Sequence, residues 1–316
     1  MRAAVLRAFG PPQNLVTETL ADPAAGPGEV RVQVELVSVT FVETQLRAGR
    51  PPHPAMTPEL PAILGNGVGG VVVETGDGAD PALAGRRVVT TTGGRGGYAT
   101  QAVVSQELPI AIPDGLELAD AVALLADGRT ALSLFEAAAV QPGETVLVEA
   151  AAGGVGSLLV QLAVAGGAHV VAVAGGTRKL ELARGLGARR AVDYGRPGWA
   201  AEAGPVDVVF DGVGGAIARA AFDLITRGGR MLSFGMASGG AAGIDAATAA
   251  AAGVTLLRPA SLTPQRQRAL SERALALAAQ GDLRPVVGQW HALDRAADAH
   301  AAIEARTTIG KTLLVV

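Results

Sequence analysis

A glycine-rich turn at residues 151–156 has the spacing in this sequence that is best suited to binding a phosphate. The segment reads AAGGVG, follows the apolar run Val146–Glu149 and precedes apolar residues spaced three and four apart. A strand, a glycine turn and a helix N-terminus in that order present backbone N–H groups to a dinucleotide pyrophosphate. We therefore predict that Gly153 lets the backbone approach a pyrophosphate and that Gly156 lets the helix pack on the strand. The alternative is an ordinary strand-to-helix turn that binds nothing.

A second glycine triplet, Gly65, Gly67 and Gly70, matches the literal spacing G-x-G-x-x-G. The β-branched run Val71–Val73 follows it, which predicts a strand and not a helix. Because the dinucleotide motif requires a helix N-terminus after its glycines, we do not assign this triplet to a cofactor site.

The segment 173–179, VAGGTRK, indicates which nicotinamide cofactor binds. An NAD site usually carries an Asp or Glu about 20 residues after the first glycines, and this segment has neither. Gly176 leaves room for a 2′-phosphate, and Arg178 and Lys179 supply positive charge. The sequence therefore favours NADPH over NADH. Alternatively, Arg178 and Lys179 are only the solvated first turn of a helix, but cations there oppose the helix dipole and a bound anion explains them better.

The composition excludes several other kinds of chemistry. The chain has 316 residues, no cysteine and four histidines, so disulfides, thiolate catalysis and cysteine-ligated zinc are excluded. The histidines have no metal-ligand spacing, and we expect no metal site. With 26 basic and 29 acidic residues, the chain has no basic field for nucleic acid. We expect His291 and His300 to be surface or packing residues.

The N-terminus has no apolar run long enough for a signal peptide, and a cytoplasmic protein is expected. The segment 150–177 has no Asp, Glu, Lys or Arg and is long enough to cross a bilayer. It is rich in glycine and includes Gln161 and His169, which favours a buried β-α-β unit over a membrane span.

The elements that must position these residues divide the chain into an α/β protein with two domains. Residues 1–110 alternate apolar and polar positions, as in Val30–Leu36, which predicts an antiparallel sheet or partial barrel. From about residue 120, strands alternate with helices, which predicts a parallel sheet with helices on both faces. Strands are expected at Val146–Glu149, Val170–Val173, Val206–Phe210, Arg230–Phe234 and Val254–Leu257.

The C-terminal tail has a third pattern. Thr263 and Pro264 suit the N-cap and first position of a helix that ends by Gly281. A second helix is expected over residues 293–305, followed by a strand at Thr312–Val316. We expect this tail to return to the first domain, so the domains are residues 1–121 with 262–316, and residues 122–261.

Short motifs in a constant order run through nearly the whole chain. They are 26–30 (GPGEV), 39–44 (VTFVET), 47–49 (RAG), 96–99 (GGYA), 130–131 (TA), 142–144 (PGE), 151–156 (AAGGVG), 186–188 (LGA), 193–194 (DY), 233–235 (SFG) and 310–311 (GK). Together they resemble the zinc-independent medium-chain dehydrogenase/reductases of the quinone oxidoreductase (zeta-crystallin-like) family. The resemblance implies a GroES-like β-rich catalytic domain, a Rossmann doubly wound parallel sheet, and a cofactor in the cleft between them. It also implies a homodimer formed by edge-to-edge pairing of the last Rossmann strand, near Val254–Arg258, which would cover an apolar edge.

The resemblance also implies roles for individual residues around the cofactor. Gly153, Gly154 and Val155 are expected to hold the pyrophosphate. Lys179 and Tyr194 are expected to contact the adenosine phosphate and ribose. Thr130, Phe234 and Gly235 are expected along the nicotinamide half, and Lys311 is expected to reach the cofactor from the C-terminal segment. Tyr194 could equally be a packed aromatic residue with a satisfied hydroxyl. Lys179 and Lys311 are the lysines of an otherwise arginine-rich chain.

On the substrate side the chain departs from the family pattern. The zinc-dependent relatives carry Gly-His-Glu where this chain has 65–67, GNG, and the usual Asn-Phe-x-Asp reads Thr40-Phe41-Val42-Glu43. A tyrosine common in the family is replaced by Gln45. Thr40, Gln45 and Asn66 are therefore the candidate catalytic hydrogen-bond donors. Each has an alternative: Thr40 bonds only backbone, Gln45 only lines the cleft, and Asn66 only serves a turn.

These expectations amount to an NADPH-dependent, metal-free transfer of hydride to a small-molecule quinone or α,β-unsaturated carbonyl. The protein's part would be to orient the donor, stabilise oxyanion charge and exclude water. Two alternatives stay open: an enoyl reductase dedicated to one biosynthetic pathway, and an NADPH-binding sensor or structural protein without catalysis.

Overall fold

The structure is a computed structural model that describes residues 1–258 and 261–316. The chain forms two compact units, a first unit of Met1–Ala126 with Ser271–Val316 and a second unit of Asp127–Leu270. The predicted α/β class, a β-rich part plus a doubly wound parallel sheet, is confirmed. The domain boundaries expected from the sequence, between residues 121 and 122 and between residues 261 and 262, stay a prediction.

The first unit contains two sheets, whose strand order is β15-β16-β3-β5-β6-β8, with β7 also paired to β3, and β2-β1-β4. All pairs are antiparallel except β15 with β16. Their bounds are β1 Arg2–Leu6, β2 Leu15–Thr19, β3 Glu29–Val39, β4 Ala62–Ile63, β5 Gly67–Thr75, β6 Arg87–Thr91, β7 Gln101–Ser105, β8 Ile110–Ala111, β15 Val287–Ala292 and β16 Lys311–Val315.

The central strand β3 buries Val30, Val32 and Val34 on one face, as its alternating pattern predicts. The neighbouring strand β5 contains the second glycine triplet's last two members, which confirms that a strand and not a helix follows Gly65. A Cβ atom added at Gly70 would overlap the carbonyl oxygen of Gln33 on β3. At this position glycine therefore allows two strands to approach each other.

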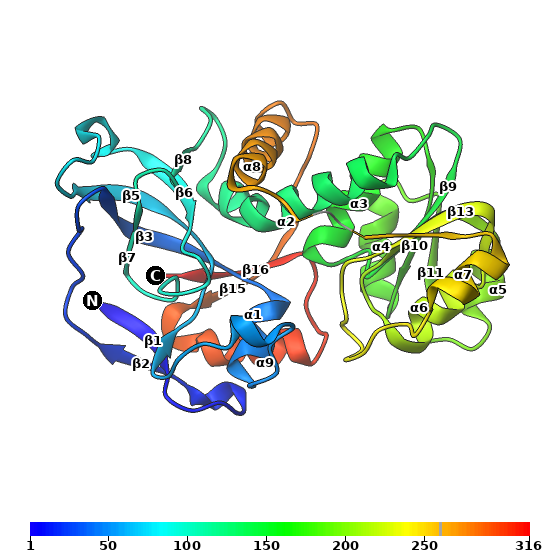
Figure 1. Cartoon of the computed structure of the whole chain (residues 1–316), viewed down its shortest axis with the longest axis horizontal. Helices are drawn as coiled ribbons and strands as arrows, with labels where there is room; N and C mark the ends of the chain where they lie inside the picture. The colour runs from blue at the N-terminus through cyan, green and yellow to red at the C-terminus, as the bar shows by residue number, and fades with distance from the viewer. Residues whose placement is uncertain (259–260) are drawn as a thin grey trace. The chain divides into compact units, whose positions relative to one another are not determined.

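From Ser271 onward the tail returns to the first unit, as expected, whereas the start of the helix α8, Pro264–Ala279, belongs to the second unit. This helix starts where predicted, because Thr263 Oγ1 accepts a hydrogen bond from the N–H of Arg266 at 3.2 Å. The strand β16 then pairs with β3, with Thr312 opposite Val39. Figure 1 shows this C-terminal strand in red beside the blue β3. The remaining helices of four residues or more in this unit are α1 Phe41–Arg47, α9 Ala296–Glu304 and the start of α2 Leu118–Ala138.

The second unit contains a six-stranded parallel sheet of order β11-β10-β9-β12-β13-β14 (Figure 1). The order runs outward in both directions from β9 and β12, so the topological switch point lies between these two strands. The bounds are β9 Thr145–Glu149, α3 Gly154–Ala165, β10 His169–Ala174, α4 Thr177–Gly185, β11 Arg190–Asp193, α5 Trp199–Ala203, β12 Val206–Asp211, α6 Gly215–Phe222, β13 Ile225–Ser233, α7 Ala246–Ala252 and β14 Thr255–Leu257.

Both faces of this sheet are buried, which explains why its strands are continuously apolar. Leu147 packs in one cluster with Trp199 of α5 and Phe222 of α6. Val146 and Val148, which point to the opposite face of β9, are also fully buried. The uncharged segment 150–177 lies mostly within α3 and β10, and no helix of the described residues is long and apolar enough to span a membrane.

Candidate active site

The glycine turn between β9 and α3 leaves backbone N–H groups available for an anion. Gly153 is the N-cap of α3, and no side chain in the described part of the chain caps this helix. A Cβ added at Gly153 would meet a single atom within 4 Å, whereas one at Gly156 would overlap the Ala150 carbonyl oxygen. Ala150 itself has a φ of 47°, a strained value for a residue with a Cβ. The turn therefore has an open face at Gly153 and a closely packed face at Gly156, as a pyrophosphate cradle requires.

An acidic residue that sequence reasoning missed lies over this turn. A Cβ added at Gly154 would overlap Oδ2 of Asp127, so this carboxylate is within contact distance of Gly154. Thr130 is three residues further along α2 and therefore lies on the same side of that helix. The structure thus places Thr130 on the helix side that meets the turn, together with a negative charge that would disfavour a bound phosphate.

The residues expected around the 2′-phosphate gather where α4 begins. Gly176, with a φ of 87°, is the N-cap, so Arg178 and Lys179 occupy the first turn. The ring of Tyr194 lies against Gly175, 3.3 Å from the position of an added Cβ. Asp193, which the sequence did not single out, accepts a hydrogen bond from the Gly176 N–H at 3.3 Å. The structure therefore brings Tyr194 to the turn that carries both cations.

Phe234 and Gly235 follow β13 at the carboxyl edge of the sheet. Their N–H groups both donate to the carbonyl oxygen of Asp211, at 2.9 and 3.3 Å. Because ligands of such sheets bind outside the carboxyl ends of the strands, this placement is compatible with the expected role at the nicotinamide half.

In the first unit, one buried carboxylate joins two of the three candidate catalytic residues. Glu43 is 2% exposed. Its Oε2 accepts the Thr40 N–H at 2.6 Å, and its Oε1 accepts the Asn66 N–H at 2.8 Å. Burial raises the pKa of Glu43, while these hydrogen bonds and the charge of Lys311 oppose the rise. Sequence reasoning did not assign Glu43 a role, although the spacing T-x-x-E at 40–43 is the signature of a capping box, which the structure contains.

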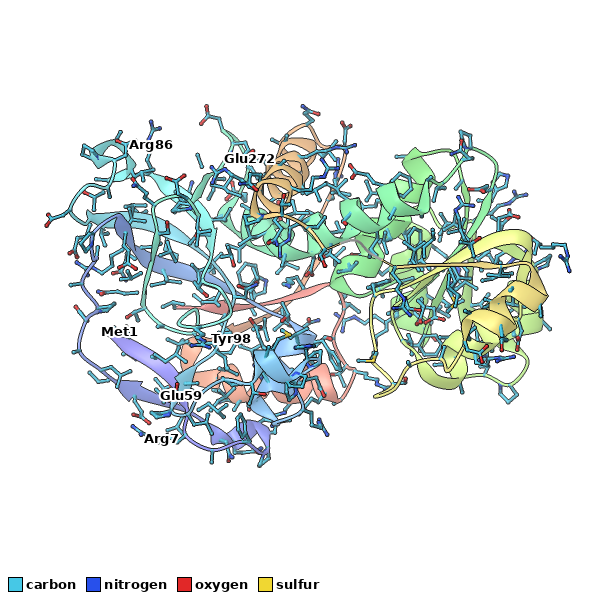
Figure 2. The ribbon with its side chains drawn as sticks, in the orientation of Figure 1. Met1, Arg7, Glu59, Arg86, Tyr98 and Glu272 are labelled. Atoms are coloured by element: carbon cyan, nitrogen blue, oxygen red, sulfur yellow. The ribbon has the colours of Figure 1, made fainter. Side chains whose placement is uncertain are left out.

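Behind Glu43 lies a buried chain of two further groups. The Tyr98 hydroxyl is 3.0 Å from Glu43 Oε2 and 2.9 Å from His300 Nε2. Burial lowers the pKa of His300 to about 3, helped by the charge of Arg47, and raises the pKa of Tyr98 well above its usual value. At neutral pH His300 is therefore uncharged and Tyr98 protonated. Tyr98 lies inside the first unit (Figure 2). His300 was expected to be either a surface or a packing residue, and the structure shows that it is a packing residue.

The three candidate donors differ in what their side chains can still do. Thr40 Oγ1 accepts the Glu43 N–H at 3.4 Å, which leaves its own hydrogen to donate. Asn66 Oδ1 accepts from Thr91 Oγ1 at 2.6 Å, which leaves the hydrogens of its amide Nδ2 to donate. Gln45 Nε2 donates to Thr44 Oγ1 at 3.0 Å. Thr40 and Asn66 are thus held together through Glu43, whereas Gln45 shares only the helix α1 with Thr40.

Two further expectations concern Lys311 and metals. Lys311 is 4% exposed, and its charge acts on Glu43. The structure therefore places this lysine near the substrate-side residues. Across residues 1–258 and 261–316, no group of three or more His, Asp or Glu side chains is arranged to hold a metal ion.

Comparisons with known proteins agree with this arrangement. Residues 26–114 match the family model "Alcohol dehydrogenase GroES-like domain", and residues 186–314 match "Zinc-binding dehydrogenase". The chain is 31% identical to a quinone oxidoreductase of Pseudomonas aeruginosa, covering 98% of this chain and 97% of that protein. It is 32% identical to a 2-haloacrylate reductase of Burkholderia sp, with 99% and 98% covered.

A solved structure with the same fold is the Escherichia coli quinone oxidoreductase complexed with NADPH. It has a TM-score of 0.90 and 27% identity, and the match covers 100% of both chains. With full-length relatives above 30% identity and a shared two-part fold, the chain belongs to the quinone oxidoreductase family of the NAD(P)H-dependent medium-chain dehydrogenase/reductases.

Proposed function

We propose that this protein uses NADPH to transfer a hydride to a quinone or an α,β-unsaturated carbonyl compound without a metal ion. The observation that carries the proposal is the α3 N-terminus at Gly153, which no side chain of the described residues caps, in a turn whose last glycine, Gly156, is required by packing. NADPH would supply the hydride, and residues of the second unit would bind and orient it. Residues of the first unit would hold the acceptor.

Binding of the phosphates is assigned to two helix N-termini. The N–H groups of Gly154 and Val155 would bind the pyrophosphate, because helix N-termini carry uncompensated donors and partial positive charge. Gly153, whose own N–H donates to the Ala150 carbonyl oxygen at 2.8 Å, would let the backbone approach the pyrophosphate. Arg178 and Lys179 in the first turn of α4 would neutralise the 2′-phosphate, with Gly176 leaving room for it. Tyr194 would contact the ribose, and Thr130, Phe234, Gly235 and Lys311 would complete the site.

The substrate carbonyl would be held by Asn66 and Thr40, with Gln45 as a third donor. As hydride reaches the acceptor, negative charge develops on its oxygen, and preorganised donors stabilise that charge. Asn66 Nδ2 and the Thr40 hydroxyl are suited to this because their other atoms are already hydrogen-bonded within the first unit. Solvent would deliver the final proton.

The test is turnover by the purified protein with NADPH and a panel of quinones and enones, followed by loss of absorbance of the reduced cofactor. We expect turnover that survives a metal chelator, and a drop in kcat of about 100-fold to 1000-fold for Asn66→Ala, as expected for loss of an oxyanion donor. Binding of NADPH with no turnover of any acceptor would contradict the proposal and support the sensor alternative.

Cofactor choice has its own test. Lys179→Ala should raise the KM for NADPH much more than the KM for NADH, because the lysine is assigned to the 2′-phosphate. The exposed Arg184→Ala, in the last turn of the same helix, is the matched control and should change neither. Equal effects of Lys179→Ala on both cofactors would show that the 2′-phosphate lies elsewhere.

A second candidate is a reductase of activated alkenes, either a pathway-specific enoyl reductase or an enzyme of small unsaturated acids. It is favoured by the 32% identity to a protein named 2-haloacrylate reductase. The same assay separates the two: a kcat/KM for 2-chloroacrylate or an enoyl thioester far above that for any quinone would favour the alkene.

We also propose a homodimer in which β14 strands of two copies pair edge to edge, in the region of Val254–Arg258. This strand is an edge of the six-stranded sheet. An unpaired sheet edge offers free backbone groups to a second strand, which supports the proposal.

A further inference from the structure

Two buried acids meet at the topological switch point of the parallel sheet. Glu149 is the last residue of β9 and Asp211 the last residue of β12, and their exposed fractions are 0% and 1%. The two strands are direct neighbours, with Phe210 opposite Val148. Both side chains therefore lie at the carboxyl edge of the sheet, where its ligand is expected.

The geometry of the pair requires a bound proton. The Val213 N–H donates to Glu149 Oε2 and to Asp211 Oδ1, both at 3.1 Å. The Glu149 and Asp211 carboxyl groups also lie within hydrogen-bonding reach of each other. Two ionised carboxylates have no hydrogen to share, so one of them must be the neutral acid.

The surrounding donors decide that Glu149 carries the proton. Asp211 also accepts the Gly214 N–H and the Ser233 hydroxyl, each at 2.7 Å, which stabilises its negative charge. Apart from Asp211, Glu149 has only the Val213 N–H as a partner among the described residues, and its Oε1 has no hydrogen-bond partner there. Burial and then the charge of Asp211 raise the pKa of Glu149 to about 10.

Among the described residues, no cation acts on the pKa of Glu149. On one side β10 places Val173 opposite Glu149, and β13 contributes the hydroxyl of Ser233. In the part of the chain that the structure describes, Asp211 is the one charged group that acts on the pKa of Glu149. The hydrogen bond from Glu149 is therefore what makes a buried Asp211 carboxylate tolerable beside it.

Asp211 in turn fixes the two segments that carry the expected nicotinamide contacts. Its carbonyl oxygen accepts the N–H groups of Phe234 and Gly235. Gly212, next in the chain, is so close that a Cβ added to it would lie 2.9 Å from the Phe234 ring. A displacement of Asp211 would therefore move Phe234 and Gly235 directly.

We propose that Glu149, as a neutral acid donating a hydrogen bond to Asp211, is a positioning residue that sets the loops after β12 and β13 for the nicotinamide half of the cofactor. This inference rests on the proposed function. It adds that binding of the nicotinamide half of NADPH depends on a protonated Glu149, whereas binding of the adenosine half does not.

The test compares two ligands on three proteins. The ligands are NADPH and adenosine 2′,5′-bisphosphate, which has the 2′-phosphate but no nicotinamide, and binding is measured by calorimetry at pH 7. Glu149→Ala should weaken the affinity for NADPH about 10-fold, the equivalent of one lost hydrogen bond to a charged group. The affinity for the bisphosphate should not change. Glu149→Gln should restore NADPH affinity to within about twofold, because an amide N–H replaces the acid O–H without a charge.

A pH series gives a readout that does not depend on whether the alanine variant folds. As pH rises from about 7 through 10, wild-type Glu149 ionises beside Asp211. NADPH affinity should then fall more steeply in the wild type than in Glu149→Gln, which cannot ionise. Glu144→Gln, which removes an acid at the opposite end of β9 that pairs with Arg230, is the control and should follow the wild type.

The outcomes separate this proposal from the proposed function. If the wild type binds NADPH and turns over an acceptor, but Glu149→Ala weakens both ligands equally or neither, the positioning role is overturned alone. Parallel pH profiles for wild type and Glu149→Gln would overturn it as well. If the wild type does not bind NADPH at all, the proposed function fails and this inference fails with it.

Discussion

Glu43, Tyr98 and His300 form a buried hydrogen-bonded group in the first unit, next to the candidate substrate-side residues Thr40 and Asn66. Because burial lowers the pKa of His300 and raises that of Tyr98, both are neutral across the physiological range. A Tyr98 hydroxyl that donates to Glu43 leaves its oxygen to accept from His300 Nε2, so the proton positions are mutually consistent. The carboxyl of Glu43 is then held from one side by this chain and from the other by the backbones of Thr40 and Asn66.

Replacing Glu43 tests this arrangement. In Glu43→Gln a side-chain NH₂ replaces one carboxylate oxygen, so the backbone N–H of either Thr40 or Asn66 faces a donor and loses its acceptor. We expect a loss of roughly 1–3 kcal/mol in the free energy of unfolding, the cost of a buried unsatisfied group, together with a lower kcat. Urea unfolding and steady-state kinetics measure the two effects. The exposed Glu35→Gln is the control, and a Glu43→Gln protein that matches it in both would argue against the role assigned to Glu43.

His300 predicts an acid-sensitive stability. Its folded-state pKa of about 3 lies below the usual 6.5, so the folded protein resists protonation that the unfolded chain accepts. The stability associated with a neutral His300 is complete above about pH 6.5 and is lost as pH falls toward 3, by at most about 1.4 kcal/mol per pH unit. His300→Gln should flatten the pH dependence of the unfolding free energy in that window. Curves parallel to those of the wild type and of the exposed-site control His169→Gln would count against this reading.

At the scale of elements, glycine is required at different places in the fold for different physical reasons. Gly156 is required because a side chain would overlap the Ala150 carbonyl, and Gly70 because one would overlap a neighbouring strand. Gly153 faces nearly open space, which suits an approaching ligand. Glycine spacing alone could not separate these cases, and only the flanking strand and helix patterns did.

Two alanine substitutions separate packing glycines from tolerant ones. Gly156→Ala should push the start of α3 away from β9, lower the unfolding free energy by about 1–3 kcal/mol as overpacking does, and weaken NADPH. Gly185→Ala has no atom within 4 Å of the added Cβ and lies in a helix without a positive φ. It should stabilise the protein by roughly 0.4–1 kcal/mol and leave NADPH affinity unchanged. Thermal unfolding measures the stability of each variant, and calorimetry measures its affinity for NADPH. Equal stability of the two variants would refute the packing argument.

At the scale of the whole molecule, the proposed homodimer depends on β14, the edge strand of the six-stranded sheet. The strand β14 has three residues, of which Thr255 is exposed. Sedimentation should give about twice the chain mass of 31.6 kDa. Thr255→Lys places a charge on the edge, which natural sheets use to prevent pairing, and should yield the monomer. A monomeric wild type, or a dimer unaffected by this change, would place the interface elsewhere or remove it.

Local patterns were enough to predict most elements and the glycine turn between β9 and α3. The alternation in 30–36 and the apolar runs at 146–149 and 170–173 became β3, β9 and β10. The helix α2, Leu118–Ala138, had no such signal. Residues on all sides of it are buried, among them Val122, Leu125 and Leu132, and a helix surrounded by protein has no polar stripe to set its period.

The sequence by itself determined the fold class, the glycine turn at 151–156, the lack of cysteine chemistry and the cations that open α4, because each depends on residue type and short spacing. Only the tertiary structure decided which acids are buried together. The Tyr98–His300 contact joins residues 202 apart, and the Glu149–Val213 contact joins residues 64 apart. Burial and the field of a neighbouring charge depend on which segments the fold brings together, and no local pattern contains that information.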